Sequence, residues 1–385
     1  MNVAVLGSGA GGHSAAADWA MAGHAVSIFD FEEFAIQTDG IMRSGGIQLE
    51  GELNGFAPIV YAGQDIARVL SGADLILVVG PAYSTEPFGT VCKPYLREGQ
   101  IVIVCPSSCG GALIFKEAAG LDNNQNRIIL AETSTLPYAA RLDAPGQVHV
   151  FLKLRGGLYV AALPTQMGPK VFEIFESVYP GSELAQNMWQ TMLQNNNPII
   201  HPAVTILNAA LIERTGGDFY FYEDGVTPAV GRLIQAVDEE KMLIGKELGV
   251  QIIPDHELGV MQGYMIDASY ENGYRTAPGF MGIRAQKKLD HRYLNEDVGY
   301  GLIFYRDLAH ALGIQTPVMD AVIKISSIIM KRDYLSEQAR TLDSLGLGGL
   351  NCKSIKEGIR VRLMMAYSLI TYFLKKELTR GYGIL

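Results

Sequence analysis

The sequence lacks the features that would indicate a membrane or nucleic-acid partner, namely long apolar runs and clusters of basic residues. The most apolar late stretch, Leu363–Leu374, is shorter than the ~18 residues that a spanning helix needs, so we expect a packing or interface helix there. Lys and Arg number 31 against 40 Asp and Glu, and the formal charge is −9. Such a chain has no electrostatic footprint for nucleic acid or an anionic membrane. We therefore expect a small-molecule partner.

Cysteine is also scarce. Cys92, Cys105, Cys109 and Cys352 form no CxxC pair and have no histidine nearby at metal-ligand spacing, so we expect no metal site. The chain enters an apolar stretch at once, without the basic segment that precedes a secretory signal. Free thiols in a reducing cytoplasm fit these observations best. The apolar tail after residue 360 is compatible with a homodimer interface.

The 385 residues are 48% apolar and 18% charged, which predicts a globular protein of two domains. In the first half, short β-rich runs alternate with helical segments, as in a parallel, doubly wound Rossmann sheet. The expected strands are Val3–Leu6, Ala25–Phe29, Leu75–Val79, Ile101–Val104 and Ile128–Leu130, then an antiparallel pair over Val148–Leu154 and Leu158–Leu163. The expected helices are Gly12–Ala22, Asp65–Leu70, Glu86–Tyr95 and Ala112–Ala118.

From about residue 186 the strand-like runs stop and helical patterns take over. Thr227 and Pro228 form a strong helix start, and Gly249 marks the end of the same helix after Leu248. Residues 255–289, broken by Gly and Pro, read as shorter helices and loops. We therefore expect an α/β domain over residues 1–185 and an all-α domain over residues 186–385.

A glycine-rich loop follows the first strand directly and opens a helix, the context in which GxGxxG binds a dinucleotide. Gly7 permits the tight turn, Gly9 lets the backbone approach a pyrophosphate, and Gly12 lets the helix pack against the strand. With Ala10, they surround a helix N-terminus whose N–H groups and dipole favour an anion. We expect this loop to bind the phosphates of a cofactor.

The second strand ends at Asp30, 18 residues after Gly12, where an acid can hydrogen-bond the adenosine ribose. A 2′-phosphate at that position would meet Asp30 together with Glu32 and Glu33, without a nearby arginine. The predicted cofactor is therefore NAD(H) rather than NADP(H).

Several ordered segments give the chain a resemblance to the opine dehydrogenases, the octopine and nopaline dehydrogenase family that also includes N-(1-carboxyethyl)norvaline dehydrogenase. The resemblance runs from the phosphate loop to about residue 350, and the ordered set is more specific than any single motif. The matching segments are Glu132–Tyr138, Asn197–Pro202, Leu207–Ala210, Glu223–Pro228, Arg292–Val298 and Thr316–Pro317.

This resemblance implies an enzyme that condenses an amino acid with a 2-oxo acid, pyruvate by analogy, and reduces the imine with NADH to an opine. It also implies a helical domain similar to the C-terminal fold of 6-phosphogluconate dehydrogenase. The family's catalytic histidine falls on His201 and its acidic partner on Asp297. Arg292 is then expected near the oxo-acid carboxylate, with Asn197 and Arg141 as further substrate residues.

The chemistry independently requires such groups, because hydride addition to an imine needs a residue that exchanges a proton near neutral pH. A carboxylate on the other ring nitrogen would hold the tautomer, and an arginine would grip a substrate carboxylate. His201 precedes Pro202 and an apolar run, which predicts a helix N-terminus and a lowered pKa for the imidazole. We expect a neutral His201 in the free enzyme.

Three other interpretations stay open. A 2-hydroxy acid or ketopantoate-type reductase would use a helical lysine, for which Lys241 and Lys246 are candidates. A dinucleotide sensor without catalysis would use the helical half to bind a partner. Arg292 and Glu296 lie one helical turn apart and could form only a surface ion pair.

Overall fold

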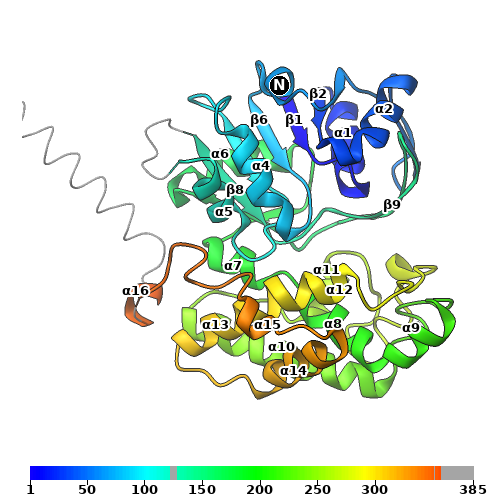
Figure 1. Cartoon of the computed structure of the whole chain (residues 1–385), viewed down its shortest axis with the longest axis vertical. Helices are drawn as coiled ribbons and strands as arrows, with labels where there is room; N and C mark the ends of the chain where they lie inside the picture. The colour runs from blue at the N-terminus through cyan, green and yellow to red at the C-terminus, as the bar shows by residue number, and fades with distance from the viewer. Residues whose placement is uncertain (122–127, 351, 357–385) are drawn as a thin grey trace, which may run out of the picture.

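The computed structural model describes residues 1–121, 128–350 and 352–356, which form a sheet-containing half and a helical half (Figure 1). An eight-stranded sheet runs through the first half, parallel except where β11 pairs antiparallel with β8. Its strands in spatial order are β12 (Ser182–Leu184), β11 (Leu158–Leu163), β8 (Ile129–Thr133), β7 (Ile101–Val104), β6 (Leu75–Val78), β1 (Asn2–Leu6), β2 (Ala25–Phe29) and β5 (Tyr61–Gly63).

Helices lie in most of the connections between consecutive strands of this sheet, and the central strands β6 and β7 are buried along their whole length. Apolar runs of this kind suit a sheet covered on both faces. The five parallel strands predicted from the sequence are all present. The helices of this half are α1 (Ala10–Met21), α2 (Ala35–Ser44), α3 (Ile66–Leu70), α4 (Thr85–Cys92), α5 (Gly111–Ala118) and α6 (Gly168–Glu176), with 3-10 turns at Glu32–Phe34, Ala82–Ser84 and Thr165–Met167.

A second, four-stranded sheet was not predicted. It consists of β4 (Gly55–Pro58), β3 (Gly46–Gly51), β10 (Gln147–Lys153) and β9 (Tyr138–Ala144), in that order. The predicted pairing of Val148–Leu154 with Leu158–Leu163 is wrong, since β10 pairs with β9 and β3 while β11 joins the main sheet. Burial explains the difference: β11 is buried at all six positions and suits a central strand, whereas β10 alternates in burial and suits a small sheet with one open face.

The helical half follows β12, and its longest helix, α10 (Pro228–Leu248), begins and ends where the sequence predicted. The Thr227 hydroxyl accepts from Val230 N, and Gly249 closes the helix with a φ of 68°. The other helices are α7 (Met188–Leu193), α8 (Asn197–Leu207), α9 (Ala209–Thr215), α11 (Asp255–Met261), α12 (Arg292–Asn295), α13 (Ile303–Ala311), α14 (Pro317–Met330), α15 (Tyr334–Glu337) and α16 (Cys352–Lys356), with a 3-10 turn at Pro278–Phe280 and a π-helical segment η5 at Asp297–Leu302.

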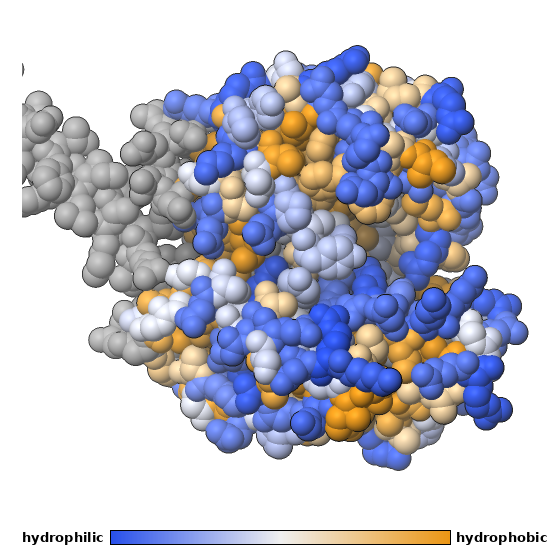
Figure 2. Space-filling view, viewed as in Figure 1, coloured by the Kyte–Doolittle hydropathy of each residue, from blue (hydrophilic) through white to orange (hydrophobic). Residues whose placement is uncertain are grey.

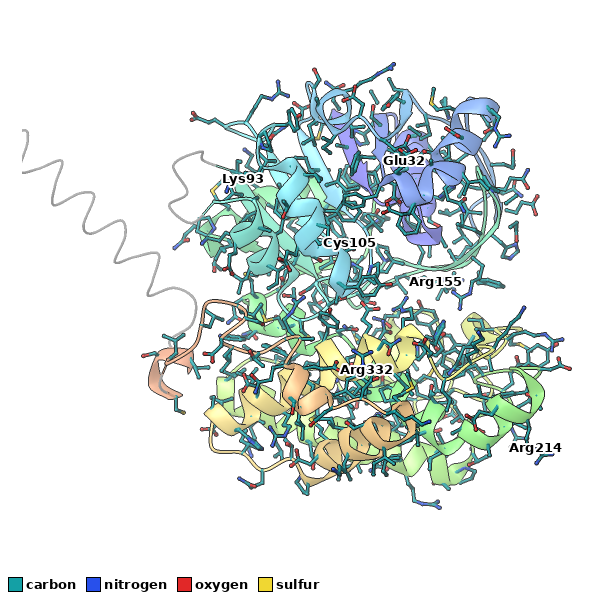
Figure 3. All side chains as sticks on the ribbon, in the orientation of Figure 1. Glu32, Lys93, Cys105, Arg155, Arg214 and Arg332 are labelled. Atoms are coloured by element: carbon teal, nitrogen blue, oxygen red, sulfur yellow. The ribbon has the colours of Figure 1, made fainter. Side chains whose placement is uncertain are left out.

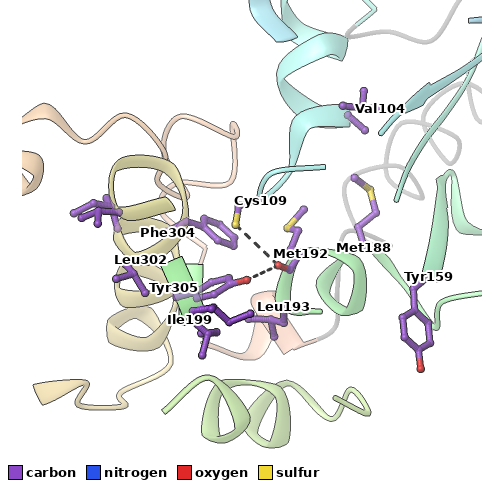
Figure 4. Packing of buried hydrophobic residues seen from close by; sticks show 14 of the residues in the cluster. Val104, Cys109, Tyr159, Met188, Met192, Leu193, Ile199, Leu302, Phe304 and Tyr305 are labelled. Atoms are coloured by element: carbon purple, nitrogen blue, oxygen red, sulfur yellow. Dashed lines mark hydrogen bonds between the residues drawn. The ribbon is translucent and has the colours of Figure 1, made fainter. Parts of the chain in front are cut away.

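The two halves share one apolar core. Met188 and Met192 on α7 lie in the same cluster as Val104 of β7 and Ile199 of α8 (Figure 4). The Tyr305 hydroxyl donates to the carbonyl of Met192 at 2.9 Å, which ties α13 to α7. This continuous packing sets the helical half firmly against the carboxyl ends of the central strands.

Burial governs the cysteines as well. Cys92, Cys105 and Cys109 are free and buried, and burial raises the pKa of each thiol to about 12. Cys105 lies inside the sheet-containing half (Figure 3). Within the part of the chain that the structure describes, no helix is long and apolar enough to cross a membrane. The helix predicted over Leu363–Leu374 lies outside the described residues.

Candidate active site

The glycine-rich loop between β1 and α1 combines close backbone packing with an uncapped helix N-terminus. A Cβ on Gly7, whose φ is +113°, would lie 2.0 Å from the Val79 carbonyl, and a Cβ on Gly12 would lie 1.9 Å from the Gly7 carbonyl. A Cβ on Gly9 would meet no atom within 4 Å. The first turn of α1, from Ala10, has no side-chain cap. Gly7 and Gly12 are therefore required by the fold itself, while Gly9 and the helix terminus leave room and N–H donors for an anion.

Asp30 follows β2 and is buried against this loop. Its Oδ2 accepts from the Ser8 backbone N and hydroxyl, both at 2.6 Å, and its Oδ1 accepts from Phe31 N at 2.8 Å. Asp30 thus fixes the phosphate loop, a role that the sequence did not suggest. Glu32 lies exposed two residues later in the same half (Figure 3). This acidic strand end fits a ribose diol better than a 2′-phosphate.

His201 and Asp297 form a buried pair in the helical half. His201 Nδ1 lies 2.7 Å from Asp297 Oδ2, and Nε2 lies 3.1 Å from the Tyr222 hydroxyl. The imidazole stacks on the Tyr293 ring with centroids 3.9 Å apart. With Asp297 ionised, Nδ1–H donates to the carboxylate and Nε2 accepts from Tyr222. Opposite contacts on the two ring nitrogens hold one tautomer in one orientation.

The position of His201 in its helix differs from the prediction. Helix α8 begins at Asn197, so His201 lies at the end of the first turn and Pro202 lies inside the helix. A Cβ on Gly301 would come within 2.3 Å of Pro198 Cγ, so this glycine allows η5 to pack closely on α8. That close packing brings Asp297, the first residue of η5, to His201.

The electrostatics of the pair are dominated by burial. Burial lowers the pKa of His201 well below its usual range, and the nearby cations Arg292 and Arg141 lower it further. Burial raises the pKa of Asp297 to about 7, against the opposing effect of Arg292. The direction for His201 agrees with the prediction, but desolvation rather than the helix dipole is its main cause. Burial therefore favours a neutral imidazole and a neutral carboxyl group at this pair.

Arg292 does pair with Glu296, but the pair is not a surface contact. Arg292 Nε lies 3.1 Å from Glu296 Oε2, and the Glu296 side chain is only 5% exposed. Its other oxygen, Oε1, accepts from Ala82 N at 2.8 Å and from the Ser108 hydroxyl at 3.2 Å. Glu296 therefore joins the helical half to the loops after β6 and β7.

A pocket opens beside Glu296 and Asp297. The space-filling view shows a recess between the two halves (Figure 2). Asn197 and Asp297 share the wall of the pocket, and the half-exposed Arg292 pairs with Glu296, another of its lining residues. Arg141, on β9, is exposed and close enough for its charge to lower the pKa of His201. The lining residues are Ser108, Cys109, Asn195, Asn197, Pro198, Glu296, Asp297, Tyr300 and Gly301.

The candidate lysines of the reductase interpretation are placed elsewhere. Lys241 is completely buried, with its Nζ 2.6 Å from Asp238 and 2.7 Å from Asn196 Oδ1. Lys246 is exposed on the same helix. Because its donors are bound within the core, Lys241 is not available to a substrate, and the structure does not support that interpretation.

Tyr222 and Tyr293, which frame His201, were missed in the sequence. Both are buried, and Tyr222 also stacks on Phe280 at 4.2 Å. Tyr222 directly precedes the segment Glu223–Pro228, and Tyr293 lies inside Arg292–Val298. Their position within or beside two of the family-like segments was the only sequence signal for them. Tyrosines in such positions are more often packing residues.

Comparisons of sequence and of structure both find opine dehydrogenases. Residues 184–330 match the family model described as NAD/NADP octopine/nopaline dehydrogenase, alpha-helical domain. An opine dehydrogenase from Arthrobacter sp. (strain 1C) is 34% identical over 92% of this chain and 98% of its own length. The structure of an octopine dehydrogenase in complex with NADH and agmatine superimposes with a TM-score of 0.75 at 18% identity, covering 92% of this chain and 97% of that one. An NADP⁺-bound yersinopine dehydrogenase gives a TM-score of 0.65 at 16% identity, with 93% and 97% covered.

Proposed function

Because the chain belongs to the opine dehydrogenase family, whose members join an amino acid to a 2-oxo acid by reduction with a nicotinamide cofactor, we propose that pyruvate is its oxo acid and that His201 and Asp297 exchange the protons. The observation that carries this proposal is the buried 2.7 Å contact between His201 and Asp297 beside the pocket. Binding of pyruvate and arginine by solved octopine dehydrogenases supports the choice of substrate classes.

The cofactor is held by the sheet-containing half. Gly7, Gly9, Ala10 and Gly12 receive the pyrophosphate, and Asp30 receives the adenosine ribose. Bound NADH supplies the hydride. Asp30 makes NADH the preferred reductant, because its carboxylate would repel a 2′-phosphate. The carboxyl ends of the parallel strands, at Ala82 and Ser108, are where an open α/β sheet places its ligand.

His201 handles the protons of condensation and reduction. The amine nitrogen attacks the oxo-acid carbonyl, water leaves, and hydride addition to the imine carbon yields the secondary amine. His201 Nε2 removes or returns the proton at the reacting nitrogen or oxygen, with the Tyr222 hydroxyl next to it. Asp297 holds Nδ1 and stabilises the imidazolium whenever it forms.

Cations bind the substrate carboxylates. Arg292 binds the oxo-acid carboxylate, since a half-exposed guanidinium at the pocket still offers its Nη donors. Arg141 approaches from the other half, and Asn197 contributes an amide from the pocket wall. The division at residues 185 and 186 thus separates cofactor binding from acid–base chemistry. We also propose that the protein resides in the cytoplasm and forms a homodimer. Sedimentation of the purified chain tests the homodimer.

A substrate screen tests the proposal. Purified protein is mixed with NADH, one of pyruvate, oxaloacetate or 2-oxoglutarate, and each amino acid in turn, and the product is identified by its mass. We expect NADH oxidation that requires both substrates and a product equal to their sum minus water plus two hydrogens. Oxidation that ignores the amine would overturn the proposal, and binding of NADH without turnover would favour the sensor interpretation.

A further inference from the structure

Arg340 is a buried cation that the function above does not use. Its side chain is 2% exposed, and it follows the last residue of the matched helical-domain segment by ten positions. Its Nη1 donates to the carbonyls of Cys109 at 2.9 Å and Ser108 at 3.4 Å, and its Nη2 donates to the carbonyl of Ala82 at 3.5 Å. Among the residues that the structure describes, no carboxylate forms an ion pair with it.

Glu296 binds the same two loops through their hydrogen-bond donors, whereas Arg340 binds their carbonyl acceptors. Its Oε1 accepts from Ala82 N and the Ser108 hydroxyl, whereas Arg340 donates to the Ala82 and Ser108 carbonyls. Both residues belong to the helical half. The Arg340 segment is anchored there by a bond from Leu342 N to Asp307 on α13, and the guanidinium lies 5.4 Å above the Tyr300 ring of η5.

These loops lie between the cofactor site and the proton-transfer pair. Strand β6 ends at Val78, and the next residue, Val79, packs against Gly7 of the phosphate loop. Ala82 lies three residues further along the same loop. Glu296 is covalently joined to Asp297, which binds His201. A shift of the loops relative to Glu296 would therefore change the distance from a substrate on His201 to a cofactor on the sheet.

We propose that Arg340 and Glu296 are positioning residues that clamp the Ala82 and Ser108 loops and set this distance. The inference deepens the proposed function and rests on it for the reaction that the clamp serves. Within the described residues, the hydrogen bonds of this buried guanidinium go to carbonyls and not to a carboxylate. Such a group is costly to desolvate, so a purely stabilising role would be better filled by an apolar side chain. Misplacement by about 1 Å of reacting groups lowers rates by about 100-fold, which makes the arrangement valuable for catalysis.

The test compares Arg340→Met, Arg340→Lys and Ser108→Ala with the matched control Arg284→Met, which removes an exposed ion pair to Asp218 in the same half. Amide hydrogen exchange is measured first on the protein without substrate or cofactor. We expect faster exchange confined to the Ala82 and Ser107–Gly110 amides in the Arg340 variants. The control leaves exchange in these loops unchanged.

Turnover then distinguishes positioning from stability. We expect Arg340→Met to lower kcat by about 10- to 100-fold while the KM for the oxo acid changes less than about threefold. Arg340→Lys should fall between, because an ammonium lacks the planar fork that reaches separate carbonyls. Ser108→Ala should lower kcat by only about two- to fivefold, the effect of a typical single hydrogen bond, because Glu296 keeps its bond to Ala82 N.

Two results would overturn the clamp: exchange that rises equally throughout the chain, or a kcat per folded molecule that stays at the wild-type value. If Arg340→Met does not fold, Arg340→Lys and Ser108→Ala decide by the same two measurements. If hydrogen exchange rises only in these loops but the wild-type protein forms no opine, the proposed function is rejected. The contact of Arg340 and Glu296 with the loops would still stand.

Discussion

The helical half contains two buried pairs, each between a carboxyl group and a nitrogen base, that look alike in distance and differ in what surrounds them. His201 and Asp297 lie 2.7 Å apart, and Lys241 and Asp238 lie 2.6 Å apart. Around Lys241 the polar atoms are used within the core, since Asp238 Oδ2 also accepts from Asp255 N and the Tyr270 hydroxyl. Asp297, by contrast, lines a pocket. This difference is the reason to propose proton transfer for the His201 pair and a structural role for the Lys241 pair.

The two pairs are also joined. Tyr274, whose hydroxyl donates to Asp255, stacks with the Tyr222 ring at a centroid distance of 6.0 Å, and Tyr222 contacts His201. The Lys241 pair is therefore connected through Asp255, Tyr274 and Tyr222 to the proposed catalytic pair. Substitutions in the pair of His201 and Asp297 should lower the turnover rate. Substitutions in the pair of Lys241 and Asp238 should lower the stability of the fold.

The largest expected effect is on turnover. We predict that His201→Gln lowers kcat by about 100- to 10,000-fold, because a general acid–base group is lost. Steady-state rates with NADH, pyruvate and the preferred amino acid measure this. His310→Gln, at an exposed position of α13, is the matched control. A kcat for His201→Gln within threefold of the wild type would contradict the assignment.

Lys241→Met should affect stability instead. Removing the ammonium leaves the Asp238 carboxylate buried without its cation, which costs about 3–5 kcal/mol. Urea unfolding measures this loss, and Lys246→Met on the exposed face of α10 is the control. We expect kcat per folded molecule to stay near the wild-type value. A hundredfold loss of kcat without a loss of stability would restore the lysine-based mechanism.

The pH dependence of stability sharpens the comparison. Burial and the nearby Asp238 raise the pKa of Asp255 from 3.8 to about 7. The folded state thus holds a proton that the unfolded state releases, and this contribution to stability is present below pH 3.8 and lost as pH rises to about 7. We predict that Asp255→Asn loses less stability than the wild type between pH 5 and pH 8, measured by urea unfolding. Equal losses in both proteins would refute the raised pKa.

The smallest effect is expected for Arg292→Lys. A lysine keeps the charge near Glu296 but lacks the bidentate geometry that suits a carboxylate. We predict a KM for the oxo acid about 3- to 10-fold higher, with little change in kcat. If the KM for NADH rises and that of the oxo acid does not, Arg292 contacts the cofactor instead of the substrate.

The parts of the molecule that depend on local sequence were predictable. The glycine loop, the strand before it and the ends of α10 follow from backbone preferences within a few residues. The pair of His201 and Asp297 came from the family resemblance, because the two residues are separated by 96 positions and no local pattern connects them. Nothing local distinguishes the clamp of Arg340 and Glu296 either.

The remaining errors have a similar physical origin. The partner of β10 was assigned to the next strand in the chain, although burial places β11 in the main sheet. The start of α8 was set at Pro202, whereas proline is also accommodated inside this helix. In both cases tertiary packing prevailed over the local pattern.

The most direct test of the account is the ionisation of His201 in the free enzyme, followed by the ¹⁵N and ¹³C resonances of its ring from pH 5 to pH 8. Burial holds its pKa below the usual 6.5. We predict a neutral ring at pH 7, with the proton on Nδ1 toward Asp297 and none on Nε2. An imidazolium that persists above pH 7 would leave no acceptor for the substrate proton and would contradict the account.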